Sequence, residues 1–217
     1  MISARSYIRS SLLLLGILFI FQISLAANPT IVVLGDSLST AYGIPTNRGW
    51  VALLRQRLDG LGYSHEVINA SVSGETTRGA GERLDELVAV HQPQLLIVEL
   101  GGNDGLRGIS LKEMRENLND IVSRGIGAGC QVLLVTMRLP PNYGSVYTDR
   151  FESIYGEVAQ STGAALAPFF LESIAGRSHL MQADGIHPQA QAQQQILDNI
   201  WPVLAKLLEN PRRSDYH

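Results

Sequence analysis

Short apolar runs alternate along this 217-residue chain with longer segments in which apolar residues recur at helical spacing. The runs expected to form strands are 31–34, 66–69, 95–100, 132–136 and 165–168. Helical spacing is clearest after the third run, at Leu111, Met114, Leu118, Ile121 and Val122. Continuous apolar strands that alternate with helices are typical of a parallel sheet covered on both faces. The pattern therefore predicts an α/β fold, a three-layer αβα sandwich around a five-stranded parallel sheet.

The alternation favours the flavodoxin-like strand order 2-1-3-4-5. In that order the ligand crevice lies at the carboxyl ends of strands 1 and 3, where the winding direction reverses. The order places the loop after the first strand, with Ser37, beside the loop after the third, with Asn103. Pro188 suits the first turn of a last helix, and Pro202 is expected to kink or break that helix. No repeat or linker interrupts the pattern, so we expect residues 27–217 to form one domain.

The first 26 residues have the three parts of a secretory signal peptide. Two arginines precede an almost wholly apolar run at 12–23, and small residues follow at Ser24 and Ala26. We expect cleavage after Ala26 and a periplasmic or secreted protein that begins at Ala27 and has no stable membrane anchor. An uncleaved anchor is the alternative, which the short length of the apolar run disfavours.

Charge and cysteine content narrow the classes of partner. Without residues 1–26 the chain has 15 basic and 20 acidic residues, a net charge of −5, and no Lys/Arg-rich run. This composition argues against nucleic acid or an anionic membrane surface as a partner. Cys130 is the only cysteine, so no internal disulfide can form, and we expect it to be a small core residue. No Cys/His cluster or H-E-x-x-H spacing indicates a metal site.

Four polar stretches lie at or near the ends of the expected strands or before the last helix. They are "GDSLS" at 35–39, "ASVSGE" at 70–75, "GGND" at 101–104 and "DGIHP" at 184–188. Each stretch alone is a weak signal, since an isolated Gly-Asp-Ser is more often a helix start than a catalytic site. Together, in this order, they indicate one polar site at a single edge of the sheet.

This combination resembles the SGNH, or GDSL, hydrolase family, named for its Ser, Gly, Asn and His. The resemblance spans nearly all of the mature chain and is strongest to the bacterial periplasmic thioesterase, lysophospholipase and arylesterase group. The stretches that carry it are "VLGDSLS", "VINASVSGET", "VELGGNDGLRG", "LPPNYG", "PFFLE" and "MQADGIHP". It implies that Ser37 is the nucleophile, that His187 is the base and that Asp184 completes the triad. Gly74 and Asn103 would form the oxyanion hole together with Ser37.

The same resemblance implies a substrate class and a mobile loop. The substrates would be small molecules, namely fatty acyl thioesters, lysophospholipids and aryl esters, hydrolysed without a cofactor. The loop at 105–110, with Leu106 and Ile109, would move over the acyl chain, and its flanking glycines suit such a motion. We expect a monomer.

The chemistry of these residue types supports the same roles. A serine hydroxyl becomes a good nucleophile when an imidazole accepts its proton, and Asp184 is close enough to His187 in sequence to orient the ring. Donors must already point at the developing oxyanion, and we expect the Ser37 N–H to be one, at a helix N-terminus. Gly74 offers an N–H at a position where a side chain could obstruct substrate, and Asn103 offers a side-chain amide. We interpret Asp36, Asp104, Ser39, Ser71 and Ser73 as groups that hold turns and loops.

The sequence therefore predicts a secreted serine esterase that acts through an acyl-enzyme. One alternative is a carbohydrate acetyl esterase with the same fold. The other is a non-catalytic flavodoxin-like module that binds a small anionic ligand at the crevice. A G-x-x-x-x-G-K-[ST] loop would favour such phosphate binding, and the sequence has none.

Overall fold

The five apolar runs form a single all-parallel sheet in the computed structural model, which describes residues 28–210. The strand order is β2-β1-β3-β4-β5, which confirms the predicted order. Every strand begins and ends within one residue of its predicted range. The strands are β1 Thr30–Gly35, β2 Glu66–Asn69, β3 Leu95–Glu99, β4 Gln131–Thr136 and β5 Ala165–Phe169.

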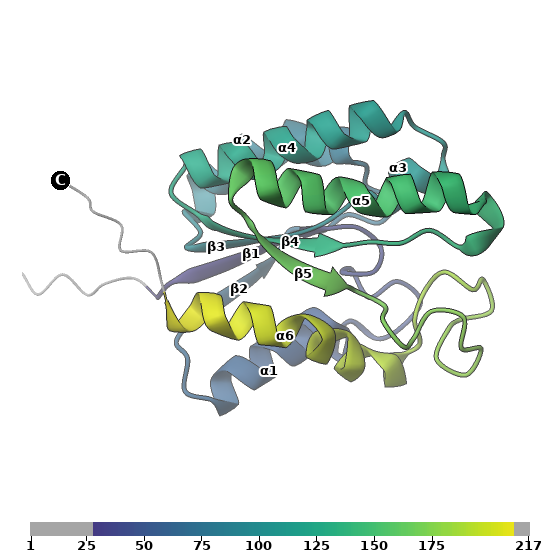
Figure 1. Ribbon diagram of the computed structural model, residues 1–217. Coiled ribbons are helices and arrows are strands. Elements are labelled where there is room, and N and C mark those ends of the chain that lie inside the picture. The colour runs from purple at the N-terminus through teal and green to yellow at the C-terminus, as the bar shows by residue number, and fades with distance from the viewer. Residues whose placement is uncertain (1–27, 211–217) are drawn as a thin grey trace, which may run out of the picture.

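Helices cover both faces of the sheet, which confirms the three-layer sandwich (Figure 1). One face carries α1 Trp50–Gly60 and α6 Gln193–Glu209. The other carries α2 Thr77–His91, α4 Leu111–Gly127 and α5 Ser145–Thr162. The shorter helices are α3 Gly102–Leu106 and three 3-10 turns: η1 Thr46–Arg48, η2 Pro141–Tyr143 and η3 Ala190–Ala192.

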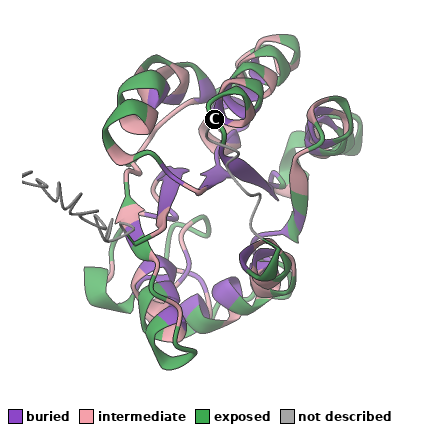
Figure 2. Ribbon diagram, turned by 90° about the vertical axis from the view of Figure 1, so that its left-hand side faces the viewer, coloured by how far each residue is buried: buried purple, intermediate pink, exposed green. Residues whose placement is uncertain are grey.

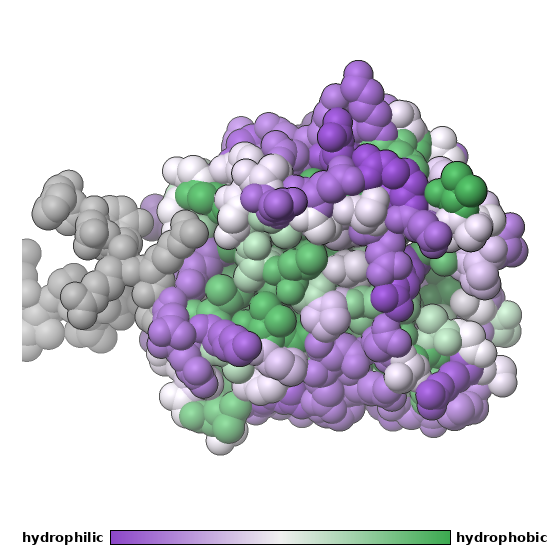
Figure 3. Space-filling view, viewed as in Figure 1, coloured by the Kyte–Doolittle hydropathy of each residue, from purple (hydrophilic) through white to green (hydrophobic). Residues whose placement is uncertain are grey.

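The core lies where the sheet meets the two helical layers (Figure 2). Every residue of β3 and β4 is buried, as expected for central strands with helices on both faces. The edge strand β5 is different, because Leu166 and Pro168 are exposed. Apolar side chains are visible on this side of the molecule, between α5 and α6 (Figure 3). Cys130 is buried in the core, as predicted.

The last helix differs from the prediction at both prolines. Pro188 lies outside α6, in an isolated antiparallel bridge with Met181, and the helix begins at Gln193. Pro202 lies inside α6 and does not break it. Proline removes one backbone donor and leaves the carbonyl four residues earlier, that of Asp198, without its helical partner. Both residues are exposed, so water can solvate that carbonyl while the opposite face of α6 packs on the core.

The segment directly after β3 also differs from the prediction. The stretch expected to be an open loop forms the short helix α3, whose N-cap Gly101 has a positive φ of 103°. A Cβ at Gly101 would lie 2.4 Å from the Tyr155 hydroxyl, which donates a hydrogen bond to the Leu100 carbonyl. Only glycine therefore fits both the backbone and the space at this turn.

The predicted signal peptide, residues 1–26, lies outside the described residues. Between residues 28 and 210, no helix is both long and apolar enough to cross a membrane.

The register of the sheet determines where a site can form. Gly35, the last residue of β1, pairs with Glu99, the last residue of β3. The loops that follow the two strands therefore leave the sheet side by side, at the position where the strand order reverses.

Candidate active site

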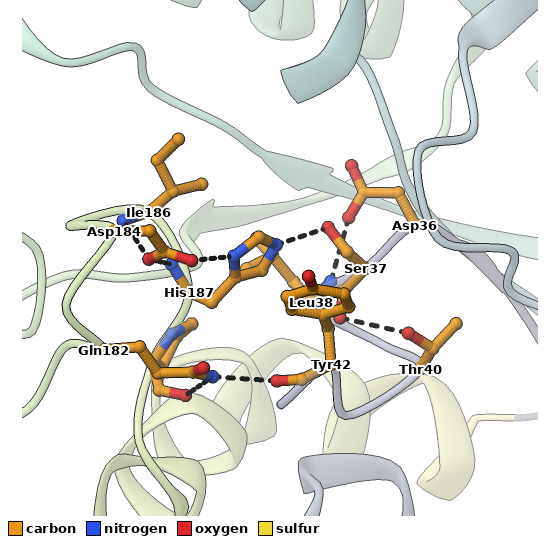
Figure 4. A network of polar contacts seen from close by, with 10 residues as sticks. Asp36, Ser37, Leu38, Thr40, Tyr42, Gln182, Asp184, Ile186 and His187 are labelled. Atoms are coloured by element: carbon orange, nitrogen blue, oxygen red, sulfur yellow. Dashed lines mark hydrogen bonds and ion pairs between the residues drawn. The ribbon is translucent and has the colours of Figure 1, made fainter. Parts of the chain in front are cut away.

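Three side chains from two distant parts of the sequence form a hydrogen-bonded chain at this edge of the sheet (Figure 4). Ser37 lies two residues beyond β1, and its Oγ is 2.9 Å from Nε2 of His187. The other ring nitrogen of His187, Nδ1, is 2.7 Å from Oδ2 of Asp184. His187 and Asp184 belong to the loop between β5 and η3. The fold thus brings together the three residues that the sequence pointed to.

Asp184 organises the turn that presents His187. Its Oδ1 accepts hydrogen bonds from the backbone N–H groups of Ile186, at 2.9 Å, and His187, at 3.0 Å. Burial opposes the charge on this carboxylate, but the hydrogen bonds from His187 and Ile186 outweigh it and lower the pKa of Asp184 from 3.8 to about 2. Asp184 is therefore ionised at neutral pH and can hold the imidazole in one orientation.

The segment that carries Ser37 is a series of turns rather than the helix start expected from the sequence. Residues 37–43 have no regular helix. The Asp36 carboxylate accepts the Leu38 N–H at 3.0 Å, and the Ser37 carbonyl accepts the Tyr42 N–H at 3.2 Å. The bond from Leu38 to the Asp36 carboxylate is of the kind that caps a helix N-terminus, but the positive φ values of Ala41, 62°, and Gly43, 73°, stop a helix from continuing. A helix dipole therefore does not act on the Ser37 N–H.

Three groups that could donate to an oxyanion line the same cavity: the N–H of Ser37, the N–H of Gly74 and the amide of Asn103. Among residues 28–210, neither backbone N–H has a hydrogen-bond acceptor. One Asn103 amide hydrogen is directed to Oδ2 of Asp36, at 2.9 Å, which leaves the second hydrogen available. Gly74 has a φ of +79°, a left-handed conformation that favours glycine independently of any substrate.

The cavity beside these groups has a volume of about 750 Å³. Its lining is mainly apolar and includes Leu38, Leu106, Met137, Leu139, Phe169 and Leu171. Leu106, one of the two residues expected to contact substrate, lines the cavity, whereas Ile109, the other, is half-buried and is not among the lining residues. The C-terminal end of α3 is held from η2 and α5, because the hydroxyls of Tyr143 and Tyr147 donate to the carbonyls of Leu106 and Gly105.

Residues 33–195 match the GDSL-like Lipase/Acylhydrolase family. The chain belongs to this family. The match covers β1 to the start of α6 and includes all three residues of the Ser37–His187–Asp184 chain.

Curated proteins and solved structures that are similar to this GDSL hydrolase are named as esterases or thioesterases. Esterase TesA of Pseudomonas aeruginosa is 48% identical over 183 residues, which are 84% of this chain and 91% of that protein. Thioesterase 1/protease 1/lysophospholipase L1 of Escherichia coli K12 is 40% identical over 173 residues, 80% of this chain and 82% of that one. A crystal structure of the psychrotrophic esterase EstA from Pseudoalteromonas sp., inhibited by monoethylphosphonate, superposes with a TM-score of 0.80 at 42% identity. It covers 84% of this chain and 100% of its own. The protein is therefore an enzyme of the esterase and thioesterase class.

Below Ser37 the hydrolase buries a carboxyl group that the sequence did not single out. Glu99 is fully buried; its Oε2 accepts hydrogen bonds from the Ser39 hydroxyl, at 2.6 Å, and from the Asp36 N–H, at 3.4 Å. Its Oε1 has no partner among the described residues. A Cβ on Gly35 would lie 2.8 Å from Oε2, so the glycine of the "GDS" stretch makes room for this carboxyl. The signal for it was a glutamate within the otherwise apolar run 95–100, "LLIVEL".

Burial raises the pKa values of the two carboxyl groups beneath Ser37, those of Glu99 and Asp36. Loss of solvation, followed by the charge of Asp36, raises the pKa of Glu99 well above its ordinary value. Burial likewise raises the pKa of Asp36 to about 6, although hydrogen bonds from Leu38 and Asn103 partly offset it. Burial in the GDSL hydrolase thus favours the neutral form of Glu99, directly beneath the loop of Ser37.

Asp104 has the structural role predicted for it. It is buried in α3 and accepts hydrogen bonds from the Thr77 backbone N–H, at 3.0 Å, and the Thr77 hydroxyl, at 2.6 Å. These bonds join α3 to the first turn of α2. Asn103 is therefore displayed from a short helix that is fixed to its neighbour.

Proposed function

We propose that the protein hydrolyses acyl esters and thioesters through a Ser37–His187–Asp184 triad and a covalent acyl-enzyme. The observation that carries the proposal is the unbroken chain of contacts from Asp184 Oδ2 through the imidazole to Ser37 Oγ, at 2.7 and 2.9 Å. Such distances suit proton transfer from the hydroxyl to the ring.

In the first half of the reaction, Nε2 of His187 accepts the hydroxyl proton while Ser37 Oγ forms a bond to the substrate carbonyl carbon. Negative charge moves to the carbonyl oxygen, where the N–H groups of Ser37 and Gly74 and the free amide hydrogen of Asn103 stabilise it. The carbon–oxygen or carbon–sulfur bond then breaks, and the alcohol or thiol leaves with the proton from His187.

In the second half, water replaces the leaving group. His187 accepts a proton from the water as the water oxygen attacks the acyl carbon. The bond from that carbon to Ser37 Oγ then breaks, Oγ takes the proton from His187, and the carboxylic acid leaves. Asp184 remains ionised throughout, because its pKa is about 2, and stabilises the imidazolium that forms in each half.

The cavity supports acyl substrates with an apolar tail. The cavity has a volume of about 750 Å³ and adjoins Ser37. Its mainly apolar lining favours a hydrocarbon chain over water. The names of the relatives, esterase and thioesterase 1/lysophospholipase L1, describe substrates of this kind. We place Leu106 in the acyl-binding wall.

Export is part of the proposal. The sequence of residues 1–26 supports removal of a signal peptide and a periplasmic or secreted enzyme that begins at Ala27. Intact-mass measurement of the exported protein tests this. An unprocessed chain that begins at Met1 would contradict it.

Substitution of the triad tests the proposed function. Ser37→Ala and His187→Ala should each lower kcat for p-nitrophenyl esters by at least about a thousandfold, and the double variant should lose little more, because the residues act as a unit. Ser73→Ala is the matched control. Ser73 also lines the cavity, but its hydroxyl contacts Thr40 rather than a histidine, so near-normal turnover is expected. Substantial turnover by folded Ser37→Ala protein would refute the triad.

A further inference from the structure

We infer that Gln182 is a positioning residue for the proposed reaction. Its side-chain amide ties the loop of His187 to the loop of Ser37 and so keeps Oγ and Nε2 within hydrogen-bonding distance. The inference rests on the proposed function, in which those two atoms exchange a proton.

The two amide hydrogens of Gln182 reach both loops. Nε2 donates to the carbonyl of Tyr42, at 2.8 Å, and to the carbonyl of Pro188, at 3.1 Å (Figure 4). Pro188 directly follows His187, and the backbone N–H of Gln182 also donates to the His187 carbonyl, at 2.7 Å. The side chain of Gln182 therefore forms a clamp that links the Pro188 carbonyl to the segment after Ser37, while the backbone N–H of the same residue holds the His187 carbonyl.

Few other interactions perform this task. Neither 36–43 nor 182–187 lies in a helix or a strand, so no regular backbone ladder connects the two segments. Between 36–43 and 180–189, the described part of the chain has two direct hydrogen bonds: Gln182 to Tyr42, and His187 to Ser37 itself. The Gln182 bond is thus the one polar link between the loops that does not involve the reacting atoms.

The surroundings of the amide are shaped to fit it. Gly43 has a φ of +73°, and a Cβ there would collide with the Gln182 amide group. The missing side chain at position 43 lets the amide lie directly against the backbone that follows Tyr42.

The clamp also determines what covers the catalytic ring. The aromatic ring of Tyr42 packs against the imidazole of His187, with ring centroids 4.5 Å apart and an angle of 38° between their planes. Because Gln182 fixes the Tyr42 carbonyl, it limits movement of this ring as well. His187 is then confined by Asp184 at one nitrogen, Ser37 at the other and Tyr42 on one face.

Loss of the clamp should slow chemistry and leave substrate binding largely unchanged. Gln182 is not among the residues that line the cavity, so it does not contact the acyl chain. A displacement of about 1 Å between reacting groups can lower a rate by about a hundredfold. For Gln182→Met, which keeps the length of the side chain and removes both donors, we expect kcat to fall about 10- to 100-fold, with KM within about twofold of the original.

Gln189 provides the matched control. It is in the same loop, and its Nε2 donates to the Met181 carbonyl at 2.8 Å, a bond that stays within the loop. Gln189→Met removes the same chemical group without affecting the link to Ser37, so kcat should stay within about twofold. A purely structural Gln182 would instead behave like Gln189 in turnover and differ only in melting temperature.

The experiment compares kcat, KM, melting temperature and the second-order rate of fluorophosphonate labelling for the full-length protein and both variants. A slow kcat and slow labelling in Gln182→Met alone would support the inference. If the wild type is labelled at Ser37 and Gln182→Met reacts within twofold of it, the positioning role is overturned and the proposed function stands. If the wild type is not labelled at Ser37, both the positioning role and the proposed function fail.

If Gln182→Met does not fold, Gln182→Glu takes its place, since a carboxylate keeps the shape but cannot donate to either carbonyl. Labelling of Gln182→Glu within twofold of the wild type also overturns the positioning role.

Discussion

Only one of the two amide hydrogens of Asn103 has a partner among the described residues, and the free hydrogen defines the role expected of this side chain. One is committed to Asp36 Oδ2 at 2.9 Å, a bond that holds the amide plane in place. The other is free, and the side chain lines the cavity with Ser37 and Gly74. An amide that is already oriented can stabilise charge in the transition state without reorganising at that moment.

Substitution of Asn103 distinguishes a role as an oxyanion donor from a purely structural role. Asn103→Ala should lower kcat about a hundred- to a thousandfold, because one oxyanion donor is lost, with little change in KM. Asn69→Ala is the control: its amide donates to the Ser39 carbonyl at 2.8 Å, and Asn69 does not line the cavity. That variant should lose thermal stability and retain turnover. Near-normal kcat in Asn103→Ala would remove Asn103 from the site.

The residues identified from sequence alone were those whose chemistry is visible in short stretches. Ser37, Asp184 and His187 stand in such stretches, and the fold joins them as expected. Glu99 and Gln182 were missed for different physical reasons. A glutamate at the end of an apolar strand reads as a solvated strand end until burial is known, and a loop glutamine gives no sign of which carbonyl its amide will reach.

Among the elements, the short helix α3 forms part of the cavity wall, whereas the turn after it does not line the cavity. Leu106 is the last residue of α3 and lines the cavity, whereas Ile109, three residues on, is not among the lining residues. Both are half-buried, so they form a matched pair in one segment. The sequence suggested both as substrate contacts, and the geometry now favours Leu106.

Chain-length dependence tests this wall. Leu106→Ser should reduce kcat/KM for long-chain p-nitrophenyl esters more than for acetate or butyrate, because each buried CH₂ contributes about 0.8 kcal/mol only where the wall is apolar. Ile109→Ser should change the rates for all chain lengths by a similar small factor. Equal losses across chain lengths in Leu106→Ser would show that the residue does not contact the acyl chain.

Strands were easier to predict than the segments that carry the chemistry. A buried parallel strand requires a continuous apolar run, and each of the five was found to within one residue. The segment after β1 was expected to start a helix, and the Asp36 side chain and carbonyl do accept the N–H groups of Leu38 and Thr40 as an N-cap would, but no regular helix follows. Ala41 and Gly43 have positive φ values of 62° and 73°, and a left-handed turn of this kind leaves no periodic signal in the sequence.

In the molecule as a whole, the parallel sheet brings polar groups together at one edge and buries two carboxyl groups there, which makes their ionisation in the folded protein unfavourable. Glu99 and Asp36 lie at or just beyond the ends of adjacent strands and are almost fully buried. A carboxyl whose pKa is raised by folding retains a proton that the unfolded chain releases, so its contribution to stability is lost as pH rises above the unfolded value. The cost of this arrangement should therefore be visible in the pH dependence of unfolding.

Glu99→Gln tests whether the buried carboxyl lowers the free energy of unfolding as the pH rises. The variant cannot ionise at this position, whereas wild-type Glu99 has a pKa raised by burial from an ordinary value of 4.5. The free energy of unfolding of the variant, relative to wild type, should rise by up to about 1.4 kcal/mol per pH unit above pH 4.5, until the folded carboxyl titrates. Chemical denaturation at several pH values measures this difference. A constant difference between pH 4.5 and 8 would show that Glu99 ionises alike in the folded and unfolded protein.

The most direct measurement of the central claim is the site of covalent reaction with a fluorophosphonate, determined by intact mass and peptide mapping. A serine activated by an imidazole attacks phosphorus, fluoride leaves, and one phosphonyl group remains on Oγ. We expect one adduct per chain, located on Ser37, with ester hydrolysis lost in proportion to labelling and no adduct in Ser37→Ala. An adduct on another residue, or full hydrolytic activity in protein labelled stoichiometrically at Ser37, would contradict the account.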